Sequence, residues 1–435
     1  MPAPELRRPP DSLRIALLVY RGNPHSGGQG VYTRYLSRHL VELGHRVTVF
    51  AGQPWPVLDA GVDFVAVPSL DLYREPDPFR VPRPGELRDW IDVAEVAVMC
   101  GGGFPEPLTF SWRARRALAA GTARGGGRLF DVVHDNQCFG RGLLGILADG
   151  YPVLGTCHHP VAVDRALDLA HAPDWRRRLS LRRWYGFVDM QNQVARRYRR
   201  IVTVSASSRS DIAGQMGIRP DRLVVVPIGA DTDLFGPRPA LPRVPGRIMT
   251  TASADVPLKG LVHLLEAVAK LRTERPDAHL VVVGRPRPGG LATQAVERLG
   301  LEGAVTWAAG VSDQRLVELY AEAQVAVVPS LYEGFSLPAV EAMACGVPLV
   351  ATTGGALPEV TGPSGQAALS VPPGDPGALA AAIEEVLAEP ALAGRLGRAG
   401  RARVLDRFTW HAAAAETARH YLWLIDDQAA TWPRC

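Results

Sequence analysis

The sequence predicts an α/β fold made of two doubly wound domains with parallel sheets. The chain has 435 residues, enough for two or three domains, each with its own core. Apolar runs of strand length alternate with helical patterns throughout, which is typical of parallel strands joined by crossover helices. A proline-rich stretch at 233–246 separates two such series, so we expect it to be a linker between two domains.

The first domain is expected to occupy residues 1–232. Its apolar runs predict eight strands, which are Arg14–Val19, Arg46–Phe50, Asp63–Val67, Ala94–Met99, Asp131–His134, Val153–Thr156, Ile201–Val204 and Leu223–Pro227.

The second domain is expected to occupy residues 247–410. Its predicted strands are Arg247–Thr251, His279–Val283, Ala304–Trp307, Val325–Val328, Pro348–Ala351 and Ala367–Val371. In doubly wound sheets ligands bind at the carboxyl ends of the strands, so two such domains predict a crevice between the ends of two sheets.

The composition excludes several classes of protein. With 47% hydrophobic and 21% charged residues, it is that of an ordinary globular protein, and a pI near 8.9 is too mildly basic to argue for nucleic acid. The cysteines have neither disulfide-framework nor zinc spacing. Because the sequence has no apolar run long enough to span a bilayer and no signal-like start, we expect a cytoplasmic protein.

A run from Glu333 to Gly346 carries the strongest functional signal. It follows an apolar run, 324–330, that we expect to be a buried strand. Ser336 is suited to cap a helix with Pro338 in its first turn, and Gly346 is suited to end that helix. The start of such a helix presents unpaired N–H groups and a partial positive charge, which favour a phosphate group.

Two glutamates flank this helix start. Glu341 lies one turn inside the helix, where its carboxylate can accept two hydrogen bonds from a ribose diol. Glu333 lies before the helix and can accept hydrogen bonds from the hydroxyl groups of a second ring, beside the ribose. Either glutamate alone would more often be a solvated side chain. Together with the spacing, the glycines and the preceding strand, the pair indicates a binding site for a nucleotide sugar.

This run resembles the Glu-x7-Glu motif of retaining GT-B glycosyltransferases, specifically glycosyltransferase family 4. The resemblance covers the chain from about Arg14 to Trp410 and is strongest from Leu316 to Val360. It implies the GT-B fold, with an acceptor domain in 1–232, a nucleotide-sugar domain in 247–410 and a cleft between them. It also implies that residues 411–435 form a helix that returns to the first domain.

A glycine-rich loop, Arg21–Gly30, follows the first predicted strand. Glycines let a ligand approach the backbone closely, although a plain strand-to-helix turn is an equally good interpretation. The loop resembles the one that the family places against the donor phosphate and the acceptor, which implies a donor contact for Gly28. It lacks the spaced dinucleotide fingerprint, so an NAD site is not expected. His45 is expected to be structural.

Histidines occur at the ends of two predicted strands, as His134 and as the doublet His158 and His159. A histidine at such a position is a structural hydrogen bonder about as often as a ligand contact. Two such strand ends at one crevice favour substrate contact. The resemblance places the donor-sugar contact at His158. No carboxylate or cysteine has metal-ligand spacing to this pair, so we do not expect a metal.

The loop after the first strand of the second domain contains Lys259 and resembles the family's Arg-to-Lys-Gly loop, whose two cations neutralise the donor pyrophosphate. Lys259 matches, whereas Ser253 or Ala254 occupies the place of the arginine. Arg285 or Arg287, after the next strand, is the hypothetical replacement. Lys259 could instead be an ordinary surface lysine at a helix start.

The predicted site residues follow from the motif and the resemblance together. The expected catalytic residues are His158, Lys259 and Glu333. The loops after two further strands, with Gly284 and Val311, are expected to hold the nucleotide base. The expected donor-binding residues are Gly28, Lys259, Gly284, Val311, Gly334, Phe335, Ser336, Leu337 and Glu341.

The resemblance implies transfer of a hexosyl group from a nucleotide diphosphate sugar, such as a UDP- or GDP-sugar, to an acceptor hydroxyl with retention of configuration. It implies no cofactor and no metal. The acceptor is not identified. The alternatives are a nucleotide-sugar 2-epimerase of the same fold and a catalytically silent nucleotide-sugar-binding protein, which the missing arginine favours. A pyridoxal-dependent phosphorylase is disfavoured.

The segment from Asp164 to Arg200 contains many more arginines than aspartates, interleaved with aromatic residues such as Trp175 and Trp184. One hypothesis is a basic amphipathic surface that contacts an anionic membrane from the cytoplasmic side. A solvated helical face is the more ordinary interpretation.

Overall fold

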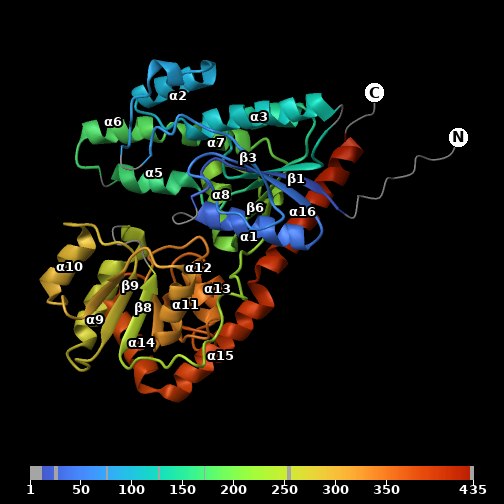
Figure 1. The fold of residues 1–435 in the computed structure, drawn as a ribbon. Coiled ribbons are helices and arrows are strands. Elements are labelled where there is room, and N and C mark those ends of the chain that lie inside the picture. Colours follow the sequence, from blue (N-terminus) through green and yellow to red (C-terminus); the bar gives the residue numbers. More distant parts are fainter. Residues whose placement is uncertain are drawn as a thin grey trace, which may run out of the picture. The chain divides into compact units, whose positions relative to one another are not determined.

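The computed structural model describes residues 12–23, 28–74, 77–125, 128–170, 172–251 and 256–431 (Figure 1). Residues 24–27 of the glycine-rich loop and the positions Ser253 and Ala254 lie outside this description. The chain forms two compact units. Unit 1 consists of residues 1–204, 209–226 and 413–435, and unit 2 consists of residues 205–208 and 227–412. Unit 2 therefore includes the stretch 233–246 that the sequence predicts as a linker.

Unit 1 contains a parallel sheet of seven strands in the order β3-β2-β1-β4-β5-β6-β7. The strands are β1 (Arg14–Val19), β2 (Arg46–Ala51), β3 (Asp63–Ala66), β4 (Val132–Asn136), β5 (Val153–Thr156), β6 (Arg200–Thr203) and β7 (Leu223–Val225).

The helices of unit 1 are α1 (Gly28–Glu42), α2 (Trp90–Cys100), α3 (Glu106–Gly125), α4 (Gly142–Ala148), α5 (Val161–Ala170), α6 (Trp175–Trp184), α7 (Phe187–Ala195), most of α8 (Ala206–Met216) and most of α16 (Trp410–Thr431), with short 3-10 turns at Pro84–Glu86 and Pro220–Arg222. The chain leaves β1 toward β2 through α1 and leaves β4 in the opposite direction through α4. Since such crossovers are right-handed, α1 and α4 must cover opposite faces. Figure 1 shows α1 and α3 on opposite sides of the sheet.

Unit 2 contains a parallel sheet of six strands in the order β10-β9-β8-β11-β12-β13. The strands are β8 (Arg247–Thr251), β9 (His279–Val283), β10 (Val305–Ala308), β11 (Val325–Val328), β12 (Leu349–Thr352) and β13 (Leu369–Val371). The helices are α9 (Leu261–Leu271), α10 (Leu291–Leu299), α11 (Asp313–Glu322), α12 (Leu337–Ala344), α13 (Leu357–Thr361), α14 (Pro376–Ala388) and α15 (Pro390–Arg407), with a 3-10 turn at Pro257–Lys259.

Each unit has its own apolar core, as parallel sheets covered on both faces require. In β1, every residue after Arg14 is buried, and all four residues of β11 are buried. The predicted α/β class with two doubly wound parallel sheets is therefore confirmed.

One predicted strand is wrong. Residues 94–99 lie inside α2, because the sequence just before them starts a helix. The Asp89 side chain accepts hydrogen bonds from the backbone N–H groups of Ile91 and Asp92, and Asp92 in turn accepts from the Asp89 N–H. This capping box outweighs the strand preference of the valines that follow. The other predicted strands are present, with ends that differ by one or two residues.

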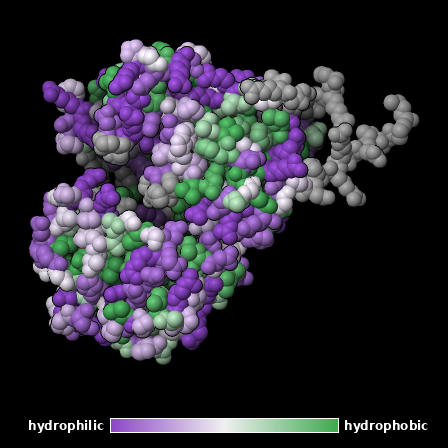
Figure 2. Space-filling view, in the orientation of Figure 1, coloured by the Kyte–Doolittle hydropathy of each residue, from purple (hydrophilic) through white to green (hydrophobic). Residues whose placement is uncertain are grey.

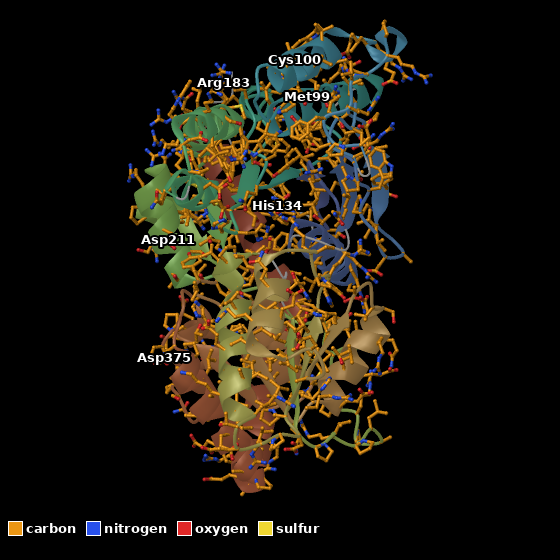
Figure 3. The ribbon with its side chains drawn as sticks, turned by 90° about the vertical axis from the view of Figure 1, so that its left-hand side faces the viewer. Met99, Cys100, His134, Arg183, Asp211 and Asp375 are labelled. Carbon is orange, nitrogen blue, oxygen red and sulfur yellow. The ribbon has the colours of Figure 1, made fainter. Side chains whose placement is uncertain are left out.

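The surface of α6 is strongly basic. Its arginines are exposed, as is Trp175, with 69% of its surface accessible. Figure 3 shows Arg183 projecting from the edge of unit 1. On the face drawn in Figure 2, hydrophilic residues surround scattered apolar patches. Among the helices that the structure describes, none has the length and apolar character needed to cross a membrane.

Candidate functional site

An ion pair between Lys259 and Glu333 lies at the carboxyl edge of the unit 2 sheet. The Lys259 Nζ is 2.8 Å from Oε1 and 3.0 Å from Oε2 of Glu333. Ser330, just after β11, donates a third hydrogen bond to Oε1 at 2.7 Å. Glu333 is buried, while about a third of the Lys259 side chain is accessible. The sequence predicts that Lys259 contacts the donor pyrophosphate and that Glu333 contacts hydroxyl groups of a sugar ring. In the structure the two side chains contact each other directly.

The glycine after Lys259 fixes this contact. Gly260 has φ +65°, a left-handed conformation that side chains disfavour, and it separates the Pro257–Lys259 turn from α9. A Cβ at this position would lie 2.0 Å from the carbonyl oxygen of Pro329. The loop can thus approach the end of β11 only because residue 260 is glycine, and this approach brings Lys259 to Glu333.

The helix after Glu333 starts as the sequence predicts. Ser336 is the N-cap of α12 and accepts a hydrogen bond from the Ala339 N–H, with Pro338 in the first turn. Ser336 has φ +99°, a strained backbone conformation for a serine. Phe335 is buried with its ring centroid 5.6 Å from that of Phe408, which anchors the loop. Gly346, at φ +68°, follows the helix. Gly334 lies between Glu333 and Phe335 in this loop, and Leu337 is the first residue of α12.

Glu341 lies on α12 beside Tyr320. The Tyr320 hydroxyl is 3.3 Å from Oε2 of Glu341 and 3.1 Å from the Thr251 hydroxyl. Burial raises the pKa of Glu341 to about 7, although the Tyr320 hydrogen bond lowers it, and the charge of Asp313 adds to the rise. Glu341 thus changes its charge close to neutral pH.

This raised pKa predicts that stability depends on pH. The folded protein binds the Glu341 proton more tightly than the unfolded chain does, so this group's contribution to stability is complete below pH 4.5 and is lost as the pH rises to about 7. Glu341→Gln should remove this loss. The measurement is the free energy of unfolding of both proteins between pH 4.5 and 8. A difference between them that does not change with pH would contradict the assignment.

A buried hydrogen-bonded network lies around His134 in unit 1. The two ring nitrogens of His134, on β4, are each 2.6 Å from a hydroxyl, Nδ1 from Tyr421 and Nε2 from Thr156. The Thr156 hydroxyl also lies 3.1 Å from that of Tyr32. Burial lowers the pKa of His134 to about 3, so the ring is neutral. His134, labelled in Figure 3, is fully buried and both of its ring nitrogens have hydroxyl partners, which favours a structural role.

His158 lies just after β5, at the carboxyl edge of the unit 1 sheet. Its Nε2 is 2.8 Å from Oδ1 of Asn136, and its ring meets that of Tyr32 edge to face at 4.6 Å between centroids. The Asn136 amide donates to the carbonyl of Gln29 and to Thr33, which turns Oδ1 toward His158. Nε2 therefore carries a hydrogen. Burial lowers the pKa of His158 to about 4, so the ring is uncharged near neutral pH.

Gln29, whose carbonyl accepts from Asn136, is adjacent to Gly28. Gly28 is exposed and begins α1, and a Cβ there would meet no atom within 4 Å. The structure thus brings the start of α1 close to the strand end that carries His158. His159 instead pairs with Asp164, at 2.7 Å, on the helix that follows.

Two other predicted contacts lie on loops of unit 2. Gly284 follows β9 and donates its N–H to the carbonyl of Ala308. Val311 lies in the turn between β10 and α11, after Gly310 with φ +64°. Arg285 and Arg287, the hypothetical replacements for the missing arginine, are both exposed after β9.

Sequence reasoning missed the supporting residues. Ser330 and Tyr320 hold the two glutamates, and Asn136 and Tyr32 hold His158. Ser330 and Asn136 stand at strand ends, a position that gives a weak signal. Tyr320 and Tyr32 lie on helices, where nothing in the pattern separates them from core residues.

Both halves of the chain match family models. Residues 26–234 match the model described as "Glycosyltransferase Family 4", and residues 240–403 match "Glycosyl transferases group 1". A "MMP alpha-(1->4)-mannosyltransferase" from Mycolicibacterium hassiacum is 53% identical over 410 residues, which cover 94% of this chain and 98% of the relative. The chain belongs to glycosyltransferase family 4.

More distant relatives and solved structures agree. A "D-inositol 3-phosphate glycosyltransferase" from Kineococcus radiotolerans is 28% identical, with 98% of each chain covered. Sucrose-phosphate synthase from Thermosynechococcus elongatus has a TM-score of 0.70 at 24% identity, covering 95% of this chain and all of that one. The glycosyltransferase WaaG, "involved in lipopolysaccharide biosynthesis", has a TM-score of 0.66 at 16% identity, with coverage of 94% and 99%. These likenesses show the GT-B fold, and the sequence relatives show a hexosyltransferase.

Proposed function

We propose that this glycosyltransferase moves a mannosyl group from a nucleotide diphosphate mannose to a hydroxyl group of a saccharide, forming an α-(1→4) linkage with retention. The observation that carries the proposal is 53% identity, over nearly the whole length, to a relative named as an α-(1→4)-mannosyltransferase. The arrangement of Lys259, Glu333 and Glu341 around α12 supports a nucleotide-sugar donor. A structural neighbour of the same fold, Anabaena HepE, has been solved in complex with UDP and glucose.

In this proposal the donor diphosphate lies at the start of α12. Lys259 would exchange part of its contact with Glu333 for the phosphate, and the backbone N–H groups near Ser336 would add partial positive charge. Glu333 would then be able to accept hydrogen bonds from the sugar hydroxyls. Glu341 would bind the ribose diol, and the loops with Gly284 and Val311 would hold the base.

The bond between the sugar C1 and the phosphate oxygen would break while the acceptor oxygen attacks C1 from the same face. The acceptor proton would pass to the departing phosphate. His158, as a neutral ring, suits a hydrogen bond to a sugar hydroxyl better than a contact with phosphate. Since Lys259 and the helix start supply the positive charge, we also propose that no metal is required.

The test is an assay of nucleoside diphosphate release with GDP-mannose or UDP-mannose and an α-(1→4)-linked mannose oligosaccharide. We expect release that depends on the acceptor, an α-linked product by NMR and full activity in EDTA. Glu341→Ala should weaken donor binding. Release without acceptor would favour a 2-epimerase or hydrolase, and tight donor binding with no turnover would favour a silent binding protein.

A further inference from the structure

A pocket in unit 2 lies away from the proposed donor site. It has a volume of about 620 Å³ and is formed by residues 237–243, the carboxyl end of α12 and α15. Cys345 and Gly346 line it, whereas Glu333 and Ser336 lie at the other end of α12. Helix α12 has 8 residues and is therefore about 12 Å long, so the pocket is separate from the proposed donor site at the start of that helix.

The charge of this pocket is entirely positive. Four arginines line it, Arg238, Arg243, Arg398 and Arg401, and none of its lining residues, all within the described chain, is acidic. The whole protein has a net charge of only +4, so this concentration of positive charge is local. Clefts lined by one sign of charge attract ligands of the opposite sign.

Three of these guanidinium groups are held by backbone carbonyls. Arg243 donates to Ala323 and Gly346, Arg401 donates to Phe235 and Ala344, and Arg238 donates to Leu234. Carbonyl oxygens are neutral, so these bonds orient the side chains and leave their charge uncompensated. Partial burial of the Arg243 guanidinium group lowers its pKa.

Part of this arrangement is structural. Arg243 and Arg401 bond carbonyls at the end of α12, where the helix dipole favours cations. That role does not account for Arg398, which is exposed on α15, nor for an open volume typical of small-molecule sites. The walls also include Pro237, Pro239 and Leu405, which suit the apolar face of a small ring.

We propose that this pocket binds a small phosphate ester of the size of a sugar phosphate. Arg398 and the fixed guanidinium groups would surround the phosphate, since planar guanidinium groups match its oxygens with paired charge-assisted hydrogen bonds. The site is independent of the proposed transfer reaction.

The test is calorimetric titration of the full chain with mannose 6-phosphate, with inorganic phosphate and with neutral methyl mannoside. The variants are Arg398→Glu and, as a matched control, Arg395→Glu, an exposed arginine on the same helix that does not line the pocket. We expect the sugar phosphate to bind more tightly than inorganic phosphate and methyl mannoside not to bind. Arg398→Glu should weaken sugar phosphate binding about tenfold or more, and Arg395→Glu should leave it unchanged.

Three results would overturn the proposal. The first is no binding of any phosphate at millimolar concentration. The second is equal affinity in the wild type and Arg398→Glu, which would place the bound phosphate at the donor site instead. The third is an equal loss in both variants, which would indicate a general effect of net charge.

Discussion

Replacing Lys259 with glutamine is expected to lower kcat/KM for the donor on the order of 100-fold. The substitution removes the positive charge that would stabilise the departing diphosphate, while the glutamine amide can still donate a hydrogen bond to Glu333. The fold of the loop should therefore be kept, because the buried carboxylate retains a partner. The measurement is the initial rate of nucleoside diphosphate release at several donor concentrations.

The matched control is Lys270→Gln. Lys259 and Lys270 are the only lysines of the chain, and Lys270 is exposed on α9. Its replacement should leave kcat/KM and the melting temperature unchanged. If Lys259→Gln keeps most of the wild-type rate with an unchanged melting temperature, Lys259 does not act on the diphosphate.

Replacing Gly260 with alanine is expected to destabilise unit 2 by about 3 kcal/mol or more, because it adds two penalties. The left-handed backbone at φ +65° disfavours any side chain, and the new Cβ would lie 2.0 Å from the Pro329 carbonyl oxygen. The nearest atoms to this Cβ are backbone atoms of Pro329, which cannot move aside without shifting the end of the strand. The end of β11 should shift, and with it Ser330 and Glu333, so donor binding should weaken too.

Gly289→Ala separates the two penalties. Gly289 also has a left-handed backbone, at φ +69°, but a Cβ there would meet no atom within 4 Å. This control should lose only about 1 kcal/mol, the cost of the backbone conformation. The measurement is denaturant-induced unfolding of both variants. Equal losses would show that the approach of residue 260 to Pro329 does not constrain the loop.

Much of the fold could be predicted because the signals are local. Buried parallel strands are continuous apolar runs, and thirteen strands of the described structure match runs in the sequence. The wrong strand, at residues 94–99, shows the limit of this reasoning. A run rich in valine and alanine suits either state, and the capping box at Asp89 decided for helix.

The candidate site was predictable only in part. The glycine spacing and the two glutamates of the α12 region form a pattern within a few residues, so the sequence carries it. The arginine pocket has no such pattern. Its members come from residues 238, 243, 398 and 401, and each alone resembles a surface arginine.

The sequence by itself determined the α/β class, the two parallel sheets, the family and the helix start between Glu333 and Glu341. Each of these follows from residues that are close together in the chain or repeat at a regular spacing. Only the tertiary structure decided that Lys259 pairs with Glu333, 74 residues away, and that Asn136 orients His158. Such contacts depend on where two loops meet after the sheets have formed, and no local preference of either loop encodes that meeting.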